Sequence, residues 1–130
     1  MKPAPSSPPC PFCDINPSHV VARHKSVYAI QDTSPVTDNH LLIIPLRHCE
    51  TYFDLTPAER CDAHALIEKL RSEILKADPL VAGFNMGVNC GETAGQTIFH
   101  THIHLIPRKK NDTPRPRGGV RGVIPDKMDY

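Results

Sequence analysis

The chain has 130 residues, enough for one domain, and 39% of them are apolar, which suits a single modest core. Its 15 basic and 14 acidic residues are interspersed and leave a formal charge of +1, so no one-signed field favours nucleic acid or an anionic membrane. No stretch approaches the roughly 20 apolar residues of a spanning helix, and the N-terminus shows no apolar segment of a signal peptide. We therefore expect a cytoplasmic protein that binds neither nucleic acid nor membrane.

The two ends of the chain differ from its middle. Residues 1–9 are mostly Pro and Ser, with little to bury, and predict a flexible tail. Residues 109–130 are basic and rich in Pro and Gly without a helical or strand period, and predict an extended tail. Its basic side chains are expected in solvent; the alternative is that they approach the phosphates of a dinucleotide. The folded domain is expected over residues 10–108.

Several apolar runs predict strands. Those at 27–30 and 41–44 flank a polar stretch rich in Thr, Ser, Pro, Asp and Asn, which indicates strand, loop and strand. A short strand at 19–23 is expected before them. Two more strands are predicted at 81–88 and 98–107, with a glycine-containing turn between them. This last pair is expected to form a hairpin with a wide loop.

One long helix is predicted in the middle of the chain. Thr56 can cap it, Pro57 suits its first turn, and Glu59 can reach back to the cap. The apolar positions that follow recur at three and four residues: Ala63, Leu66, Ile67, Leu70, Ile74 and Leu75. The helix should run to about Lys76 and pack one face on a sheet.

Three histidines alternate in the last predicted strand, at His100, His102 and His104. Residues two apart in a strand share a face, so the three imidazoles are expected to line one surface. A neutral imidazole is a competent nucleophile toward phosphorus and a good leaving group when water attacks in a second step. The alternative is that two of these histidines bind a catalytic zinc or iron ion completed by a carboxylate or a further histidine.

The residues around these histidines extend the pattern. Gly95, Gln96 and Thr97 precede them, and Leu105, Ile106, Pro107 and Arg108 follow them. This run resembles the signature of the histidine triad (HIT) superfamily. Upstream, Asp32, His40 and His48 surround the apolar run 41–44 as in that family's first nucleotide-binding segment, and Asn89 precedes the Gly-rich loop. The resemblance covers residues 10 to about 108.

The resemblance implies a nucleotide hydrolase with a covalent intermediate. His102 would attack the α-phosphorus of a nucleoside phosphate derivative, and water would then release a nucleoside monophosphate such as AMP. His40 and His104 would orient and polarise the nucleophile, and Gln96 would assist at the phosphate or the leaving group. Suitable substrates would be dinucleoside polyphosphates, phosphoramidates or related adducts. No organic cofactor is implied.

The same resemblance implies the binding residues, the fold and the assembly. Asp32 would hold the ribose hydroxyls, Asn89 the phosphate or its loop, and Gln96 and Thr97 phosphate oxygens, with His102 and His104 also against the substrate. The fold would be α+β, with an antiparallel sheet of about five strands and one long helix packed on it. A homodimer is implied, and pairing of an edge strand with its twin would cover that edge.

A separate metal site is expected from the C-x-x-C pair Cys10 and Cys13, because no thioredoxin-like strand and helix surround it. A closed zinc site needs two more ligands, and the resemblance to zinc-containing branches of the superfamily indicates His48 and His100. This assignment takes His100 out of the catalytic set. The alternative is that the two cysteines are unliganded thiols.

Two other functions stay open on the sequence. Nucleotidyl transfer to an acceptor other than water is one, although Thr101 stands where the uridylyltransferase branch has Pro. The other is a nucleotide-binding or scaffold protein with little turnover.

Overall fold

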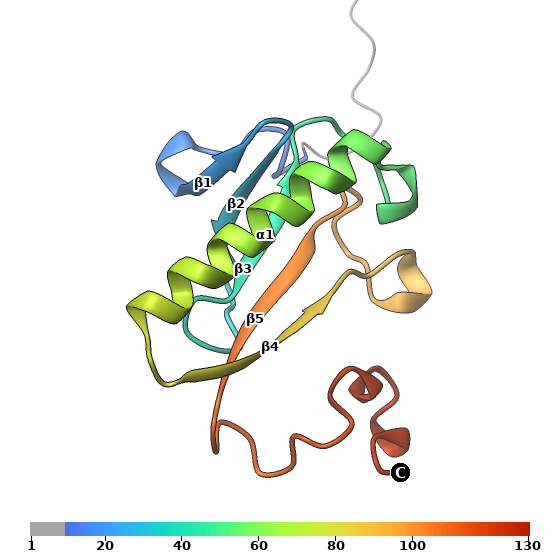
Figure 1. The fold of residues 1–130 in the computed structure, drawn as a ribbon. Helices are drawn as coiled ribbons and strands as arrows, with labels where there is room; N and C mark the ends of the chain where they lie inside the picture. Colours follow the sequence, from blue (N-terminus) through green and yellow to red (C-terminus); the bar gives the residue numbers. More distant parts are fainter. Residues whose placement is uncertain (1–9) are drawn as a thin grey trace, which may run out of the picture.

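A computed structural model describes residues 10–130; the tail expected at residues 1–9 lies outside this range. The model contains one long helix, α1 (Pro57–Ala77), and five strands, which are β1 (Val20–His24), β2 (Val27–Gln31), β3 (Leu41–Pro45), β4 (Val81–Gly87) and β5 (Ile103–Lys109). The strands form one antiparallel sheet in the order β1-β2-β3-β5-β4, and α1 crosses one of its faces (Figure 1). The predicted α+β fold is confirmed.

The start of α1 agrees with the capping residues in the sequence. Thr56 Oγ1 accepts a hydrogen bond from the Glu59 N–H (3.1 Å), and Glu59 Oε1 accepts one from the Thr56 N–H (2.8 Å). Arg47, just after β3, donates to both Glu59 carboxylate oxygens. The helix start is therefore tied to the end of β3, near the segment that carries His48.

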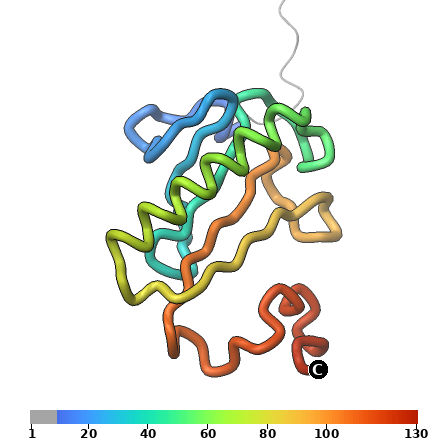
Figure 2. Tube along the Cα trace, in the orientation of Figure 1, coloured from blue at the N-terminus to red at the C-terminus, as the bar shows by residue number. Residues whose placement is uncertain are grey.

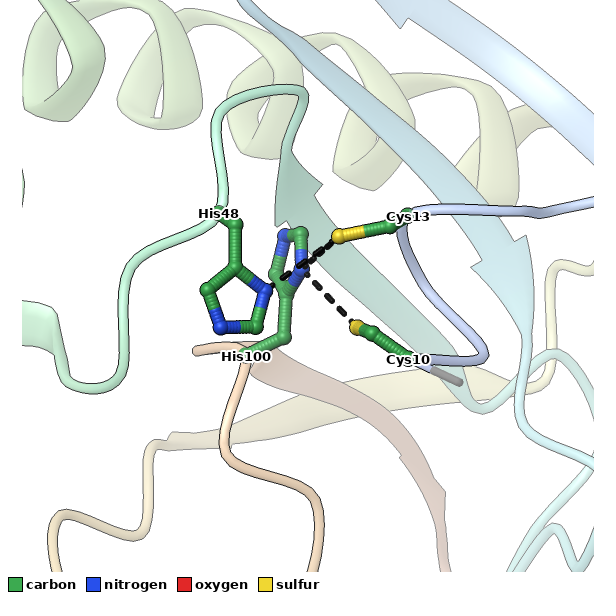
Figure 3. Close-up of side chains that lie close together, drawn as sticks. All are labelled: Cys10, Cys13, His48 and His100. Atoms are coloured by element: carbon green, nitrogen blue, oxygen red, sulfur yellow. Dashed lines mark hydrogen bonds between the residues drawn. The ribbon is translucent and has the colours of Figure 1, made fainter. Parts of the chain in front are cut away.

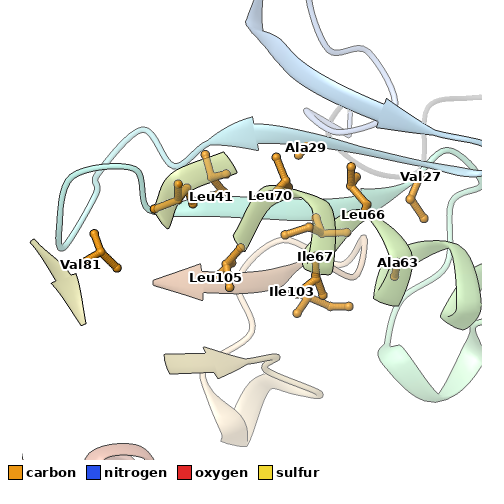
Figure 4. Close-up of a cluster of buried hydrophobic side chains, with 12 residues drawn as sticks. Val27, Ala29, Leu41, Ala63, Leu66, Ile67, Leu70, Val81, Ile103 and Leu105 are labelled. Carbon is orange, nitrogen blue, oxygen red and sulfur yellow. The ribbon is translucent and has the colours of Figure 1, made fainter. Parts of the chain in front are cut away.

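The sheet buries its two faces differently. Between α1 and the sheet lies the main core, which Figure 4 shows and which includes Val27, Ala29, Leu41, Ile43, Ala63, Leu66, Ile67, Leu70, Ile103 and Leu105. On the opposite face Phe12 packs with Tyr28, Ile30, Leu42 and Ile44. Side chains alternate along β5, so Ile103 and Leu105 face α1 while His104, paired with Leu42, faces the other side. The candidate site lies on this second face.

The last strand is shorter than the sequence predicts. It was expected from residue 98, but β5 begins at Ile103. The preceding residues leave the ladder, since the Thr101 N–H donates to the Cys49 carbonyl (2.8 Å) and His100 is fully buried against the chain that follows β3. The three histidines therefore do not form one row along a strand: His104 lies in β5, and His100 and His102 lie in the segment before it.

The C-terminal segment, defined here as residues 110–130, is not the extended tail expected from its composition. It contains two short 3-10 helices, η4 (Gly119–Val123) and η5 (Pro125–Lys127), and it curls back beside β4 (Figure 2). Gly118 permits this turn: its φ is +94°, and a Cβ there would collide with the Met128 main-chain carbonyl. Across residues 10–130, no helix is long and apolar enough to cross a membrane.

Candidate active site

The structure brings together the four residues expected to bind metal, which we call the Cys/His cluster: Cys10, Cys13, His48 and His100 (Figure 3). The two cysteines lie on the turn that opens the described chain, His48 follows β3, and His100 precedes β5. Cys10 Sγ lies 3.3 Å from His100 Nδ1, and Cys13 Sγ lies 3.2 Å from His48 Nδ1. One ligand atom from each residue lies within 4.8 Å of all the others.

The orientation of His100 suits a metal ligand. Its Nε2 lies 2.8 Å from the Pro45 carbonyl oxygen. Because a carbonyl only accepts, Nε2 carries the proton, and the lone pair of Nδ1 is directed to the cysteines. Burial lowers the pKa of His100, which keeps the ring neutral. Two thiols and two imidazoles in this arrangement can hold a tetrahedral metal ion.

A second cluster joins Asp32, His40 and His104, and we call it the Asp–His–His chain. His40 Nε2 lies 2.9 Å from His104 Nδ1 and 3.4 Å from Asp32 Oδ2. The main-chain N–H of Val36 donates to His40 Nδ1 (3.1 Å). Since an amide N–H only donates, the proton of a neutral His40 must be on Nε2, which then donates to His104 Nδ1. The proton of a neutral His104 is in turn on its Nε2.

Burial keeps both histidines of this chain neutral. Desolvation lowers the pKa of His40, and the nearby Asp32 carboxylate opposes that shift without reversing it. Desolvation also lowers the pKa of His104, with smaller contributions from His102 and His40. A catalytic metal at this chain is disfavoured by its hydrogen bonds, because His40 Nε2 carries a proton and has no lone pair to offer. One ligand atom each of Asp32, His40 and His104 lies within 4.8 Å of the others, but the hydrogen bonds use these atoms and favour the catalytic over the metal-binding alternative.

His102 lies between the two clusters. Its ring packs against Phe12 on one side, at 5.0 Å between centroids, and toward His104 on the other, at 5.4 Å. His102 Nδ1 lies 3.0 Å from the His100 carbonyl oxygen and must donate to it. The lone pair of His102 is thus on Nε2, where it can attack an electrophile. The main-chain carbonyl of His100, a candidate metal ligand, therefore orients the ring of His102, the candidate nucleophile.

The remaining predicted site residues lie on the loop between β4 and β5. Asn89 lines the same cavity as His40 and His104. Thr97 is exposed on this loop. Gln96 is 3% exposed, and its amide bonds main chain: it accepts from the Gly91 N–H and donates to the carbonyls of Glu50 and Ile98. These contacts give Gln96 a role in holding the loop that the sequence did not indicate.

Three site contacts were not predicted. They are the Phe12 ring against His102, the Val36 N–H on His40 and the Pro45 carbonyl on His100. Phe12 lies between the two predicted cysteine ligands in CPFC, and this position is the sequence feature that places it near the site. The other two contacts are made by main-chain atoms, whose partners depend on the fold and not on residue type.

Comparisons with known proteins show the family of this chain. The HIT domain family model matches residues 14–111. The bis(5'-nucleosyl)-tetraphosphatase (asymmetrical) of Schizosaccharomyces pombe is 39% identical over 95 residues, covering 73% of this chain and 52% of that protein. Adenylylsulfatase HINT3 of Arabidopsis thaliana is 37% identical over 107 residues, covering 79% and 54%. An AP-4-A phosphorylase of Mycobacterium tuberculosis is 34% identical over 113 residues, covering 82% and 57%. The chain spans about half the length of these relatives.

Solved structures show the same fold. A HIT family protein from Bacillus anthracis aligns with a TM-score of 0.71 at 39% identity, covering 79% of this chain and 75% of that one. A zinc-bound histidine triad family protein from Mycobacterium smegmatis aligns with a TM-score of 0.73 at 28% identity, covering 82% and 79%.

Proposed function

The chain belongs to the HIT family, and from this membership we propose that it cleaves nucleotide derivatives through a covalent nucleotidyl intermediate on His102, releasing a nucleoside monophosphate. The observation that carries the proposal is the hydrogen bond from His102 Nδ1 to the His100 carbonyl oxygen. It leaves the Nε2 lone pair as the nucleophile. The relatives named for tetraphosphatase, adenylylsulfatase and phosphorylase activities support a nucleotide substrate.

In the first step His102 Nε2 attacks the α-phosphorus. A phosphorus–nitrogen bond forms, and the bond from phosphorus to the leaving group breaks with its electron pair going to the leaving group. The His102 ring becomes an imidazolium, whose positive charge is stabilised by the His100 carbonyl already bonded to Nδ1. Phosphoryl transfer asks mainly for such positioning and for well-placed donors.

The Asp–His–His chain supplies a donor to this step. His40 donates to His104 Nδ1, so the His104 Nε2–H is free to donate a hydrogen bond to a phosphate oxygen or to the departing group, without giving up its proton. Asp32 Oδ2 lies 3.4 Å from His40 Nε2 and keeps negative charge beside the donor pair. Asp32 Oδ1 accepts from the Ser34 N–H (2.8 Å), which fixes its side chain where it can also meet the ribose hydroxyls.

In the second step an acceptor attacks phosphorus and the bond to His102 Nε2 breaks, which restores the neutral ring. With water, which loses one proton to the solvent, the product is a nucleoside monophosphate. With inorganic phosphate it is a nucleoside diphosphate, and the relative named AP-4-A phosphorylase makes this the second candidate. Following AMP and ADP release with and without added phosphate distinguishes the two.

We propose that Asn89 and Thr97 form the phosphate side of the site, on a loop that Gln96 supports. Asn89 lines the cavity next to His104, and Thr97 is exposed on the same loop. Gln96, bonded to main chain, holds that loop in place.

We further propose that the Cys/His cluster binds zinc in a structural role. The set of two thiols and two imidazoles suits zinc, and His100 is already held in the ligating tautomer by Pro45. A bound ion would fix His100, and with it the carbonyl that orients His102. Zinc would supply no step of the reaction here.

The test is AMP release from diadenosine tetraphosphate and from adenosine 5'-phosphoramidate by wild type and His102→Ala. The variant should lose turnover by roughly 10³-fold or more while still binding AMP. His64→Ala is the matched control, because His64 is exposed on α1 and pairs only with Glu68 in the described chain. Turnover retained in His102→Ala would overturn the covalent mechanism. A wild type that binds AMP but cleaves neither substrate would indicate a binding protein.

A further inference from the structure

The loop between β2 and β3, residues 32–40, carries two members of the Asp–His–His chain at its ends, Asp32 and His40. These ends are joined, since the Asp32 N–H donates to the His40 carbonyl oxygen (2.9 Å). The residues between them, 33–39, are all exposed except Thr37. Thr37 is therefore where the middle of the loop packs against the rest of the chain.

The Thr37 side chain ties the loop to β5. Its hydroxyl donates a hydrogen bond to the Pro107 main-chain carbonyl oxygen (2.8 Å). The neighbouring Asp38 makes a weaker contact: its carboxylate lies 4.0 Å from Lys109 Nζ, and its side chain is 89% exposed. Solvent screens such an ion pair and leaves it little strength. The Thr37 hydroxyl is thus the contact that fixes the loop on the sheet.

Two further hydrogen bonds pass this placement on to His40. The His40 N–H donates to the Thr37 carbonyl oxygen (3.2 Å), and the N–H of Val36, next to Thr37, donates to His40 Nδ1 (3.1 Å). A ring nitrogen that accepts a hydrogen bond carries no proton, so the proton of the neutral His40 ring is on Nε2. One main-chain N–H, held in place through Thr37, sets the tautomer of His40.

The tautomer of His40 decides what His104 can offer a substrate. His40 Nε2–H donates to His104 Nδ1 (2.9 Å), which leaves the His104 proton on Nε2, free to meet a phosphate oxygen. If the His40 proton moved to Nδ1, His104 would have to donate from its own Nδ1, and its Nε2 would carry a lone pair. Both rings would stay neutral, but the donor to the phosphate would be lost.

Asp32 favours the same arrangement of protons as the loop does. Its Oδ2 lies 3.4 Å from His40 Nε2, and the negative charge stabilises a proton on that nitrogen. Loss of the Val36 contact should therefore weaken the donor without abolishing it.

We propose that Thr37 is a positioning residue of the reaction: its hydroxyl keeps the loop on β5, so that His40, and through it His104, stay in the tautomer that donates to the phosphate. Thr37 acts through the loop, because the proton of its hydroxyl is already used by Pro107. The effect on turnover rests on the proposed function, whereas the effect on the tautomers does not depend on turnover.

The test replaces Thr37 with Val, which keeps the branched side chain and removes the hydroxyl. Thr37→Val should lower kcat for diadenosine tetraphosphate by about tenfold, the effect of about one hydrogen bond, and should leave the Kd for AMP at the wild-type value. Thr37→Ser keeps the hydroxyl and should restore kcat. Thr33→Val is the matched control, because it makes the same change at an exposed position of the same loop.

A second readout measures the tautomers directly. In protein made with ¹⁵N-labelled histidine, a ring nitrogen that carries a proton differs widely in chemical shift from one that does not. At alkaline pH, wild type should show the proton on Nε2 of both His40 and His104, and Thr37→Val should show a mixture of tautomers in both rings. Spectra of His40→Asn and His104→Asn assign the signals. A loss of stability alone would lower Tm and leave the tautomers of the folded protein unchanged.

Wild-type tautomers in Thr37→Val would overturn the inference, and so would a wild-type kcat in a variant whose tautomers have changed. A Thr37→Ser variant as slow as Thr37→Val would also overturn it, because the hydroxyl would then not be the group that matters. If wild type cleaves neither diadenosine tetraphosphate nor adenosine 5'-phosphoramidate while Thr37→Val still changes the tautomers, the proposed function fails and the control of His40 by Thr37 is supported.

Discussion

Removal of the metal ion proposed for the Cys/His cluster is expected to destabilise the fold about as much as loss of a disulfide. The cluster joins Cys13 to His48, 35 residues apart, and Cys10 to His100, 90 residues apart. By the chain-entropy relation, closing the shorter loop alone is worth about 4 kcal/mol. For a chain of this size that lowers Tm by roughly 10 to 15 °C.

Thermal unfolding followed by circular dichroism, with and without EDTA, checks this expectation alongside the metal content of the purified protein. Cys13→Ser should have a lower Tm than wild type, and EDTA should not change that Tm. Cys61→Ser is the control, since Cys61 is exposed on α1 and outside the cluster, and it should respond to chelator as wild type does. A chelator effect on wild type of less than about 2 °C would refute the structural role.

Three further predictions follow from the site and the fold. Burial in the folded chain lowers the pKa of His40 and of His104 from the ordinary histidine value of 6.5. As the pH falls below 6.5, the unfolded chain therefore binds protons at these residues before the folded chain does. The free energy of unfolding should then decline by up to ~1.4 kcal/mol per pH unit for each residue. Urea denaturation above and below this pH should show the decline. His40→Asn should reduce the slope of unfolding free energy against pH and lower kcat by about 10²-fold or more. An unchanged slope in that variant would contradict the effect of burial on His40. Thr56→Ala should lower the free energy of unfolding by about 1 kcal/mol without affecting kcat, because it removes the acceptor of the Glu59 N–H. We also predict a homodimer, since β4 is an edge strand, and sedimentation equilibrium should give twice the mass of the chain; a monomer at all concentrations would contradict it.

Local signals predicted most of the fold. The capping residues Thr56 and Glu59 determine where α1 begins, and their hydrogen bonds depend on residues three apart. The apolar runs correspond to β2, β3 and β4, and the residues of the family motif include the histidines and the four members of the Cys/His cluster.

The errors came from contacts between distant residues. Periodicity placed a strand from residue 98, but His100 bonds the Pro45 carbonyl and Thr101 bonds Cys49, so the ladder starts later. The C-terminal segment has a tail-like composition, and its place depends on η4 contacting β4 and on Gly118 passing Met128. No local pattern encodes those pairings.

The central claim is the covalent intermediate on His102, and the most direct measurement is mass spectrometry of protein quenched at alkaline pH during turnover of diadenosine tetraphosphate. A fraction of the wild-type chain should gain the mass of one nucleoside monophosphoryl group, fragmentation should place it on His102, and His102→Ala should gain nothing. Turnover without any such adduct, or an adduct on another residue, would contradict it.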